Sequence, residues 1–116
     1  MAHAPLGMWH NGIRVCDAEV AETREDRRRG LIGREDLTGV LVLRPCRSVH
    51  SFRMRFVLDV AGCRREADGS FRVRWVRLLL RNRALPPGLV ANVMIEAKFG
   101  SFKAWGIKRG DRIEIK

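Results

Sequence analysis

Apolar residues occur along the chain in short runs separated by turn residues, a pattern typical of many short strands. Residues 71–75 alternate strictly, so Phe71, Val73 and Trp75 share one face of a strand and arginines occupy the other. After Trp75 the apolar positions change parity, which predicts a bulge near Val76. Further strands are expected over residues 13–20, 39–43, 56–60, 90–97 and 112–115.

Turn and cap residues divide these runs. Asn11-Gly12 and Asp68-Gly69 are dipeptides of the kind favoured in two-residue hairpin turns. Thr23, followed by Arg24-Glu25-Asp26-Arg27-Arg28-Arg29 and Gly30, predicts a short helix. Its acids lie in the first turn and its last arginines in the final turn, as the helix dipole favours, and Gly30 suits a left-handed cap.

A second helical turn is expected from Ser101, as its N-cap, to Gly106, which ends it. The strands do not alternate with helices in a βαβ rhythm. The sequence therefore predicts a mainly β (α+β) fold, a small antiparallel β-barrel or sandwich with two short helices. We expect one domain over residues 1–116, because this length supports a single hydrophobic core.

The chain is strongly basic, with a formal net charge of +10, and 19 of its 23 basic residues are arginine. Such a charge favours contact with nucleic acid, and Arg72, Arg74 and Arg77 would form the phosphate-facing surface. The arginines are nevertheless spread along the chain, and tyrosine is absent, which leaves few aromatic side chains to stack on bases. Nucleic-acid binding is therefore the alternative and not the first interpretation.

The cysteine pattern and the hydropathy bear on the compartment. Cys16, Cys46 and Cys63 form an odd set without a CxxC pair, which is typical of reduced thiols. No apolar run approaches the roughly 20 residues needed to span a bilayer, so no membrane partner is expected. Residues 1–8 have neither a basic start nor a long apolar stretch, so we expect no secretory signal and a cytoplasmic protein.

The most informative segment is 49–60, where polar and charged residues run into an apolar strand that contains Asp59. A carboxylate in an apolar run needs a partner, and either backbone amides or the neighbouring arginines Arg53 and Arg55 would serve. The functional hypothesis makes this acid the polar end of a ligand pocket. The predicted lining residues are His50, Phe52, Met54, Arg55 and Asp59.

Cys46 and His50 are four residues apart, a spacing that suggests a metal pair or a Cys–His nucleophile. Only a helix would place them on one face, and Pro45 argues against a helix there. No other His or Cys is placed to complete a tetrahedral set, and no oxyanion-hole motif accompanies the pair. We therefore predict no metal, no cofactor and no catalytic residue.

Three blocks in order resemble domain-of-unknown-function family 192 of bacteria and archaea. They are residues 21–34, which end in Arg29-Gly30-Leu31-Ile32-Gly33-Arg34, then residues 49–60, Val49-His50-Ser51-Phe52-Arg53-Met54-Arg55-Phe56-Val57-Leu58-Asp59-Val60, then residues 105–111, Trp105-Gly106-Ile107-Lys108-Arg109-Gly110-Asp111. The resemblance spans about residues 12–115. It implies a compact, mostly β domain without an agreed biochemical role.

The expected function is that of a non-enzymatic β domain that binds a small molecule or a protein partner in a groove beside residues 50–59. The alternatives are a basic nucleic-acid-associated protein and a small hydrolase-like enzyme. The enzyme would use His50 and Asp59, since unrelated folds can carry the same chemistry.

Overall fold

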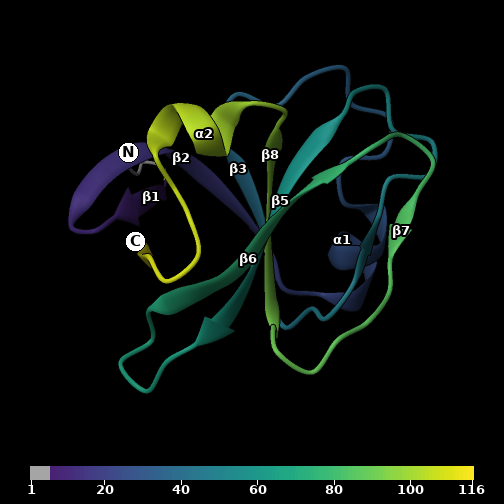
Figure 1. Cartoon of the computed structure of the whole chain (residues 1–116). Helices are drawn as coiled ribbons and strands as arrows, with labels where there is room; N and C mark the ends of the chain where they lie inside the picture. The colour runs from purple at the N-terminus through teal and green to yellow at the C-terminus, as the bar shows by residue number, and fades with distance from the viewer. Residues whose placement is uncertain (1–5) are drawn as a thin grey trace, which may run out of the picture.

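The computed structural model describes residues 6–116, and its main body is a closed barrel of seven strands (Figure 1). Residues 1–5, which include His3 and most of the segment considered for a secretory signal, lie outside the described residues. The elements are β1 (Gly7–His10), β2 (Ile13–Ala21), α1 (Arg24–Arg29), β3 (Val40–Leu43), β4 (Val49–His50), β5 (Leu58–Arg65), β6 (Phe71–Leu79), β7 (Ala84–Leu85), β8 (Val93–Lys98), α2 (Ser101–Trp105) and β9 (Arg112–Ile115).

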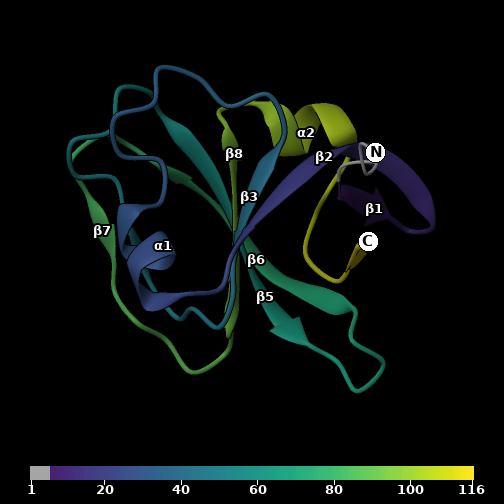
Figure 2. The same ribbon diagram turned by 180° about the vertical axis from the view of Figure 1, so that it is seen from behind.

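The strands follow the order β1-β2-β3-β8-β5-β6-β9, and β9 pairs with β1 to close the barrel. The mainly β class with two short helices is confirmed, and the barrel is the form adopted. The sheet is mixed, however, because β2 and β3 run parallel while the other barrel pairs are antiparallel. Parallel neighbours need a crossover connection, and residues 22–39 with α1 supply it. Figure 2 shows α1 on the outside of the barrel.

Two hydrophobic cores result. The inner core fills the barrel with side chains such as Met8, Phe71 and Ile113. The outer core lies between the outer face of β3, β5 and β8 and the segments that cover it, and includes Leu31 and Leu58. These three strands are covered on both faces, which explains their continuous apolar sequences.

The predicted turns of the first half are confirmed. Asn11 and Gly12 have φ values of 49° and 88°, as a two-residue hairpin of type I′ requires. The Thr23 side chain accepts a hydrogen bond from the Asp26 N–H at 3.0 Å, and the Gly30 N–H donates to the Asp26 carbonyl at the other end of α1. β4 and β7 form a separate two-stranded sheet that the pattern did not predict.

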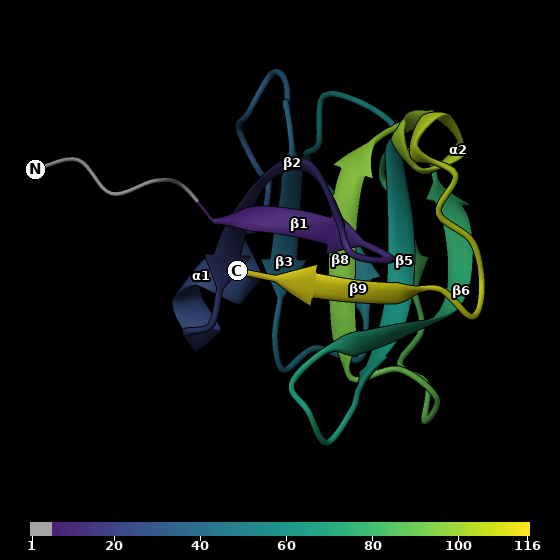
Figure 3. The ribbon, with the colours of Figure 1, turned by 90° about the vertical axis from the view of Figure 1, so that its left-hand side faces the viewer.

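The cap of α2 differs from the prediction. Ser101 is the first helical residue and makes no capping bond, and Gly100 occupies the N-cap position. The Phe102 N–H instead donates to the Asp59 carboxylate at 3.2 Å. The prediction of Ser101 as the N-cap was wrong, because the acceptor for the Phe102 N–H comes from β5, a strand far away in the sequence. Gly106 ends the helix with φ 71°, as predicted. Figure 3 shows α2 over one end of the barrel.

The predicted bulge occurs in β6, two residues earlier than expected. Gly62 of β5 pairs with Trp75 and Cys63 pairs with Val73, so Arg74 has no partner in β5. The bulge returns Val76 to the inner core and turns Trp75 toward the outer core. Within residues 6–116, neither helix has the length and apolar character needed to cross a membrane.

Replacing Gly39 by alanine tests the junction between the parallel strands. A Cβ at this buried position would overlap the Asp17 carbonyl oxygen, a backbone atom of β2 that cannot move aside alone. We expect Gly39→Ala to lower the free energy of unfolding by about 1–3 kcal/mol in urea denaturation. Gly88→Ala is the matched control, because nothing lies within 4 Å of its Cβ. An equal effect of the two substitutions would contradict the close approach.

Replacing Asp59 by alanine tests the α2 cap. Loss of the carboxylate leaves the Phe102 N–H without its acceptor, and we expect a loss of about 1–2 kcal/mol in the free energy of unfolding. Glu35→Ala is the control, since Glu35 is 81% exposed and forms only a surface pair with Arg55. A stability change in Asp59→Ala no larger than in the control would refute the capping role.

Candidate functional site

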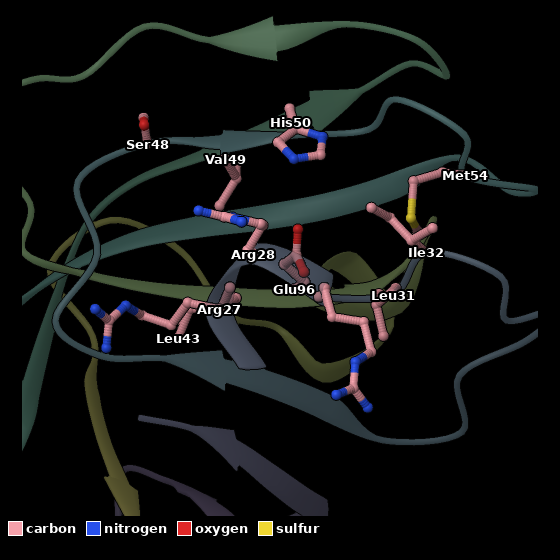
Figure 4. A pocket seen from close by; sticks show the side chains of 12 residues that line it. Arg27, Arg28, Leu31, Ile32, Leu43, Ser48, Val49, His50, Met54 and Glu96 are labelled. Atoms are coloured by element: carbon pink, nitrogen blue, oxygen red, sulfur yellow. The ribbon is translucent and has the colours of Figure 1, made fainter. Parts of the chain in front are cut away.

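A cavity of about 200 Å³ lies between the C-terminal end of α1, strand β4 and the outer face of the sheet (Figure 4). Its floor is Glu96 of β8, one wall is α1 and the opposite wall is β4. Polar groups from all three elements therefore meet over one part of the outer core. The lining residues are Arg27, Arg28, Arg29, Gly30, Leu31, Ile32, Leu43, Ser48, Val49, His50, Met54 and Glu96.

Glu96 occupies an outward position of β8, which places it on the floor of the cavity. The neighbours Ile95 and Ala97 face the inner core, so alternation directs Glu96 to the outer face. There it pairs across the strands with Leu41 of β3 and Val60 of β5, both buried. Its side chain is thus set among apolar groups, and the residue is only 3% exposed.

The Glu96 carboxyl group has no hydrogen-bond or ion-pair partner among residues 6–116, and burial alone raises its pKa to about 8. Every fully enclosed side-chain nitrogen or oxygen in the described part of the chain has a hydrogen-bond partner, whereas the Glu96 oxygens have none. The Glu96 oxygens must therefore be open to the cavity, and Figure 4 shows the carboxyl group directed into it. At neutral pH this group is protonated and can donate a hydrogen bond.

The wall opposite β4 is basic. Gly30 and the buried Leu31 seat the end of α1 on the outer core, which brings the last three helical residues to the rim. Arg29 lies 3.7 Å from Glu25, and Arg27 donates to the Glu22 carbonyl. Arg28 is exposed and has no ion-pair partner within residues 6–116. It therefore supplies the cationic group that is available to a ligand.

His50 and Met54 form the other side. Met54 is buried, whereas His50 stacks on Phe52 with ring centroids 5.2 Å apart. The Phe52 N–H donates to His50 Nδ1 at 3.3 Å, so in the neutral ring the proton lies on Nε2. Ser51 anchors this segment, because its buried hydroxyl donates to the Leu80 carbonyl and accepts from the Arg83 N–H.

Of the five residues predicted to line one pocket, His50 and Met54 line this cavity and three do not. Phe52 is 48% exposed and does not line the cavity, and Arg55 forms an exposed pair with Glu35 at 2.9 Å. Asp59 lies between Leu58 and Val60, which face the outer core, so its side chain is on the opposite face of β5.

The hydrolase-like alternative would use His50 and Asp59 together. The alternation along β5 places the Asp59 side chain on the inner face of the sheet, whereas His50 lines the cavity on the outer face. Asp59 is 8% exposed, and its carboxylate accepts a hydrogen bond from the N-terminus of α2, at the barrel end. Of the three partners considered for it, backbone amides are the one that the structure supplies. The role of His50 and Met54 in binding a ligand stays a prediction.

The three arginines of β6 that were predicted to face nucleic acid have different surroundings. Arg72 pairs with Glu66 at 2.8 Å and donates to the Gly110 carbonyl. Arg77 stacks over the Trp75 ring at 4.9 Å. Arg74 is exposed at the bulge. Two of the three guanidinium groups therefore already have partners within the domain.

The Cys46 thiol of the Cys46–His50 spacing is hydrogen-bonded to a backbone carbonyl. The Cys46 thiol donates to the Ser48 carbonyl at 2.9 Å, and burial raises its pKa, which disfavours the thiolate. Over residues 6–116 no group of three His, Cys, Asp or Glu side chains is placed to hold a metal ion.

Sequence reasoning missed Glu96, although a usable signal was present. Glu96 is the one acid within the apolar run Val93–Ala97, just as Asp59 is the one acid in its own strand. The rule that singled out Asp59 applies equally here. No sequence pattern links the α1 residues to Glu96, because their proximity to β8 depends on the crossover.

Comparison with known proteins supports the fold and the family. A protein of unknown function from Novosphingobium aromaticivorans DSM 12444 superimposes with a TM-score of 0.75 at 20% identity, covering 95% of this chain and 83% of that chain. A candidate transcription regulator from Sinorhizobium meliloti 1021 gives 0.74 at 17% identity, covering 98% of both chains. At such identities the likeness establishes the fold alone.

No curated protein sequence matches the chain significantly. A family profile does match, over residues 8–115, which span all nine strands apart from the first residue of β1. The resemblance inferred from the three sequence blocks is thereby confirmed. The chain belongs to the DUF192 family, described as Uncharacterized ACR, COG1430.

Proposed function

We propose that this domain binds a small molecule in the cavity between α1 and β4, without catalysing its conversion. The observation that carries the proposal is Glu96, a carboxyl group that is 3% exposed, lacks a partner within residues 6–116 and opens into the cavity. Apolar walls with a few convergent polar groups are the usual composition of a ligand site. A perturbed carboxyl group in such a cleft adds to this argument.

Glu96 destabilises the folded domain at neutral pH, which argues against a purely structural role. Its pKa rises from 4.5 to about 8 on folding, so between these values the folded state holds a proton that the unfolded state has released. Stability therefore falls as pH increases through this window, by at most about 5 kcal/mol. A residue that lowers stability and forms no internal bond is best explained by a ligand.

The net charge of +10 supports a second candidate function, contact with nucleic acid through the β6 arginines. Arg74 and Arg77 have no ion-pair partner among residues 6–116, and Arg74 is the one that is also free of an aromatic contact there. The structural neighbour from Sinorhizobium meliloti that is a candidate transcription regulator is in keeping with this function. Binding of this kind would weaken steeply as salt increases.

Replacing Glu96 by glutamine tests the cost of the buried carboxyl group. The glutamine side chain keeps the shape and a hydrogen-bond donor but cannot ionise, so we expect Glu96→Gln to be more stable than the wild type by several kcal/mol near pH 8.5. The difference should shrink toward zero near pH 3.5, below the unfolded pKa of 4.5, because the carboxyl group is then mostly protonated in both the folded and the unfolded state. Urea denaturation across this range measures it, and a difference that does not depend on pH would contradict the buried position.

A thermal-shift screen tests the proposed function. The wild type, Glu96→Leu and Glu25→Gln are compared against a metabolite library and short oligonucleotides, at low and moderate salt. We expect a metabolite to raise the melting temperature of the wild type and of Glu25→Gln, whose residue lies outside the cavity lining, but not of Glu96→Leu.

Two results of this screen would contradict small-molecule binding in the cavity. One is a metabolite shift that Glu96→Leu retains in full. The other is a set of shifts confined to oligonucleotides and abolished by moderate salt, which would favour the nucleic-acid function. The absence of any metabolite shift would favour a protein partner.

A further inference from the structure

We infer that the Glu96 cavity takes a small organic acid, a carboxylate with a short apolar tail, whose oxygens bind Glu96 and Arg28. This inference rests on the proposed function, because it names the class of ligand for the same site. It follows from the hydrogen-bonding capacity of the lining groups, from their charge and from the size of the cavity.

The polar groups that face the cavity are mainly donors. Arg28 carries only N–H donors, and His50 presents its Nε2–H because Nδ1 already accepts from the Phe52 N–H. The protonated Glu96 carboxyl group supplies an O–H donor toward the cavity. A ligand that satisfies such a set must offer acceptors, and a carboxylate offers only acceptors.

The charge around the cavity selects against cations. Three arginines from α1 and no acid other than Glu96 line it. The remaining titratable groups near Glu96 are His50 of β4 and Cys46, which follows β3 and has its pKa raised in part by Glu96. The domain as a whole carries +10, which attracts anions.

Arg28 is the guanidinium group best able to hold the anion. Glu25 and Asp26 lie within 3.7 and 3.9 Å of Arg29, and Arg27 is bound to the Glu22 carbonyl. Arg28 lacks an ion-pair partner among residues 6–116, and Figure 4 shows its side chain beside Val49, on the same side as the Glu96 carboxyl group. An O–H donor and a guanidinium both make strong, charge-assisted bonds to a carboxylate.

The apolar walls and the volume set the size of the tail. Leu31, Ile32, Leu43, Val49 and Met54 line the rest of the cavity. A volume of about 200 Å³ holds roughly six or seven non-hydrogen atoms at the packing of liquid water. Butyrate, with a carboxylate and a three-carbon tail, fits this limit.

The test uses three probes of similar size, each with a short alkyl tail: butyrate, n-butylamine and 1-butanol. Each is titrated into the ¹⁵N-labelled full chain at about pH 6.5 and about pH 9.5, and binding is followed at the amide signals of Gly30, Val49 and His50. At the lower pH, where Glu96 is protonated, we expect butyrate to bind at least about tenfold more tightly than butanol and butylamine to shift none of these signals.

The variants make the assignment specific. Above the pKa of Glu96 the ionised group repels a carboxylate, so butyrate affinity should fall about tenfold per pH unit in the wild type. Glu96→Gln should lack this tenfold fall per pH unit, because glutamine cannot ionise. Arg28→Gln should weaken butyrate binding about tenfold or more. Arg24→Gln, a change on the same helix but outside the cavity lining, should leave the affinity unchanged.

Two outcomes would overturn the inference and are separable from a failure of the proposed function. Tighter binding of butylamine than of butyrate at about pH 6.5, where Glu96 is protonated, would show a cation site. That result keeps the cavity as a binding site but refutes the organic acid. A titration in which butyrate shifts the cavity amides at neither pH also refutes the organic acid. The metabolite screen with Glu96→Leu then decides independently whether the cavity binds any small molecule.

Discussion

The parallel pairing of β2 with β3 is the constraint on which the rest of the structure depends. Parallel neighbours cannot be joined by a hairpin, so the chain crosses from the end of β2 to the start of β3. The crossover carries α1 onto the outer face of the barrel, where Leu31 joins a second hydrophobic core. This outer face of the barrel is therefore buried and not exposed to solvent.

The covered outer face of the barrel is a hydrophobic core, and Glu96 is the one acidic residue of β8 that lies in it. Along β8 the buried outward residues are Met94 and Glu96, and the strand ends at the exposed Lys98. Met94 packs in the outer core, whereas the acid leaves a space between the sheet and α1. An apolar residue at position 96 would extend the outer core over the same strand. The carboxyl group instead weakens folding at neutral pH and keeps a polar group open to a small cavity.

Local features of the fold could be predicted from the sequence because they depend on neighbouring residues. The hairpin at Asn11-Gly12 and the Thr23 cap each follow from a few adjacent side chains. The parallel pair could not be predicted in this way, since strand order depends on contacts far apart in the sequence. Two short strands, β4 and β7, were missed because two residues carry no periodic signal.

The candidate site was predicted only in part, for the same physical reason. His50 and Met54 were recognised because they lie in one segment with a distinctive pattern. Asp59 in that segment faces the other side of the sheet, since neighbouring strand residues alternate between faces. The groups that complete the cavity, Glu96 and the end of α1, come from elements that the crossover brings together.

The central claim is that Glu96 is a buried carboxyl group, unpartnered within residues 6–116, that stays protonated at neutral pH. The most direct measurement is a ¹³C NMR titration of the Glu96 carboxyl carbon in the free protein, with Glu96→Gln to assign the signal. The structure predicts a pKa of about 8. A pKa near the ordinary value of 4.5 would contradict the claim, because it would mean that solvent or a cationic partner already satisfies the group.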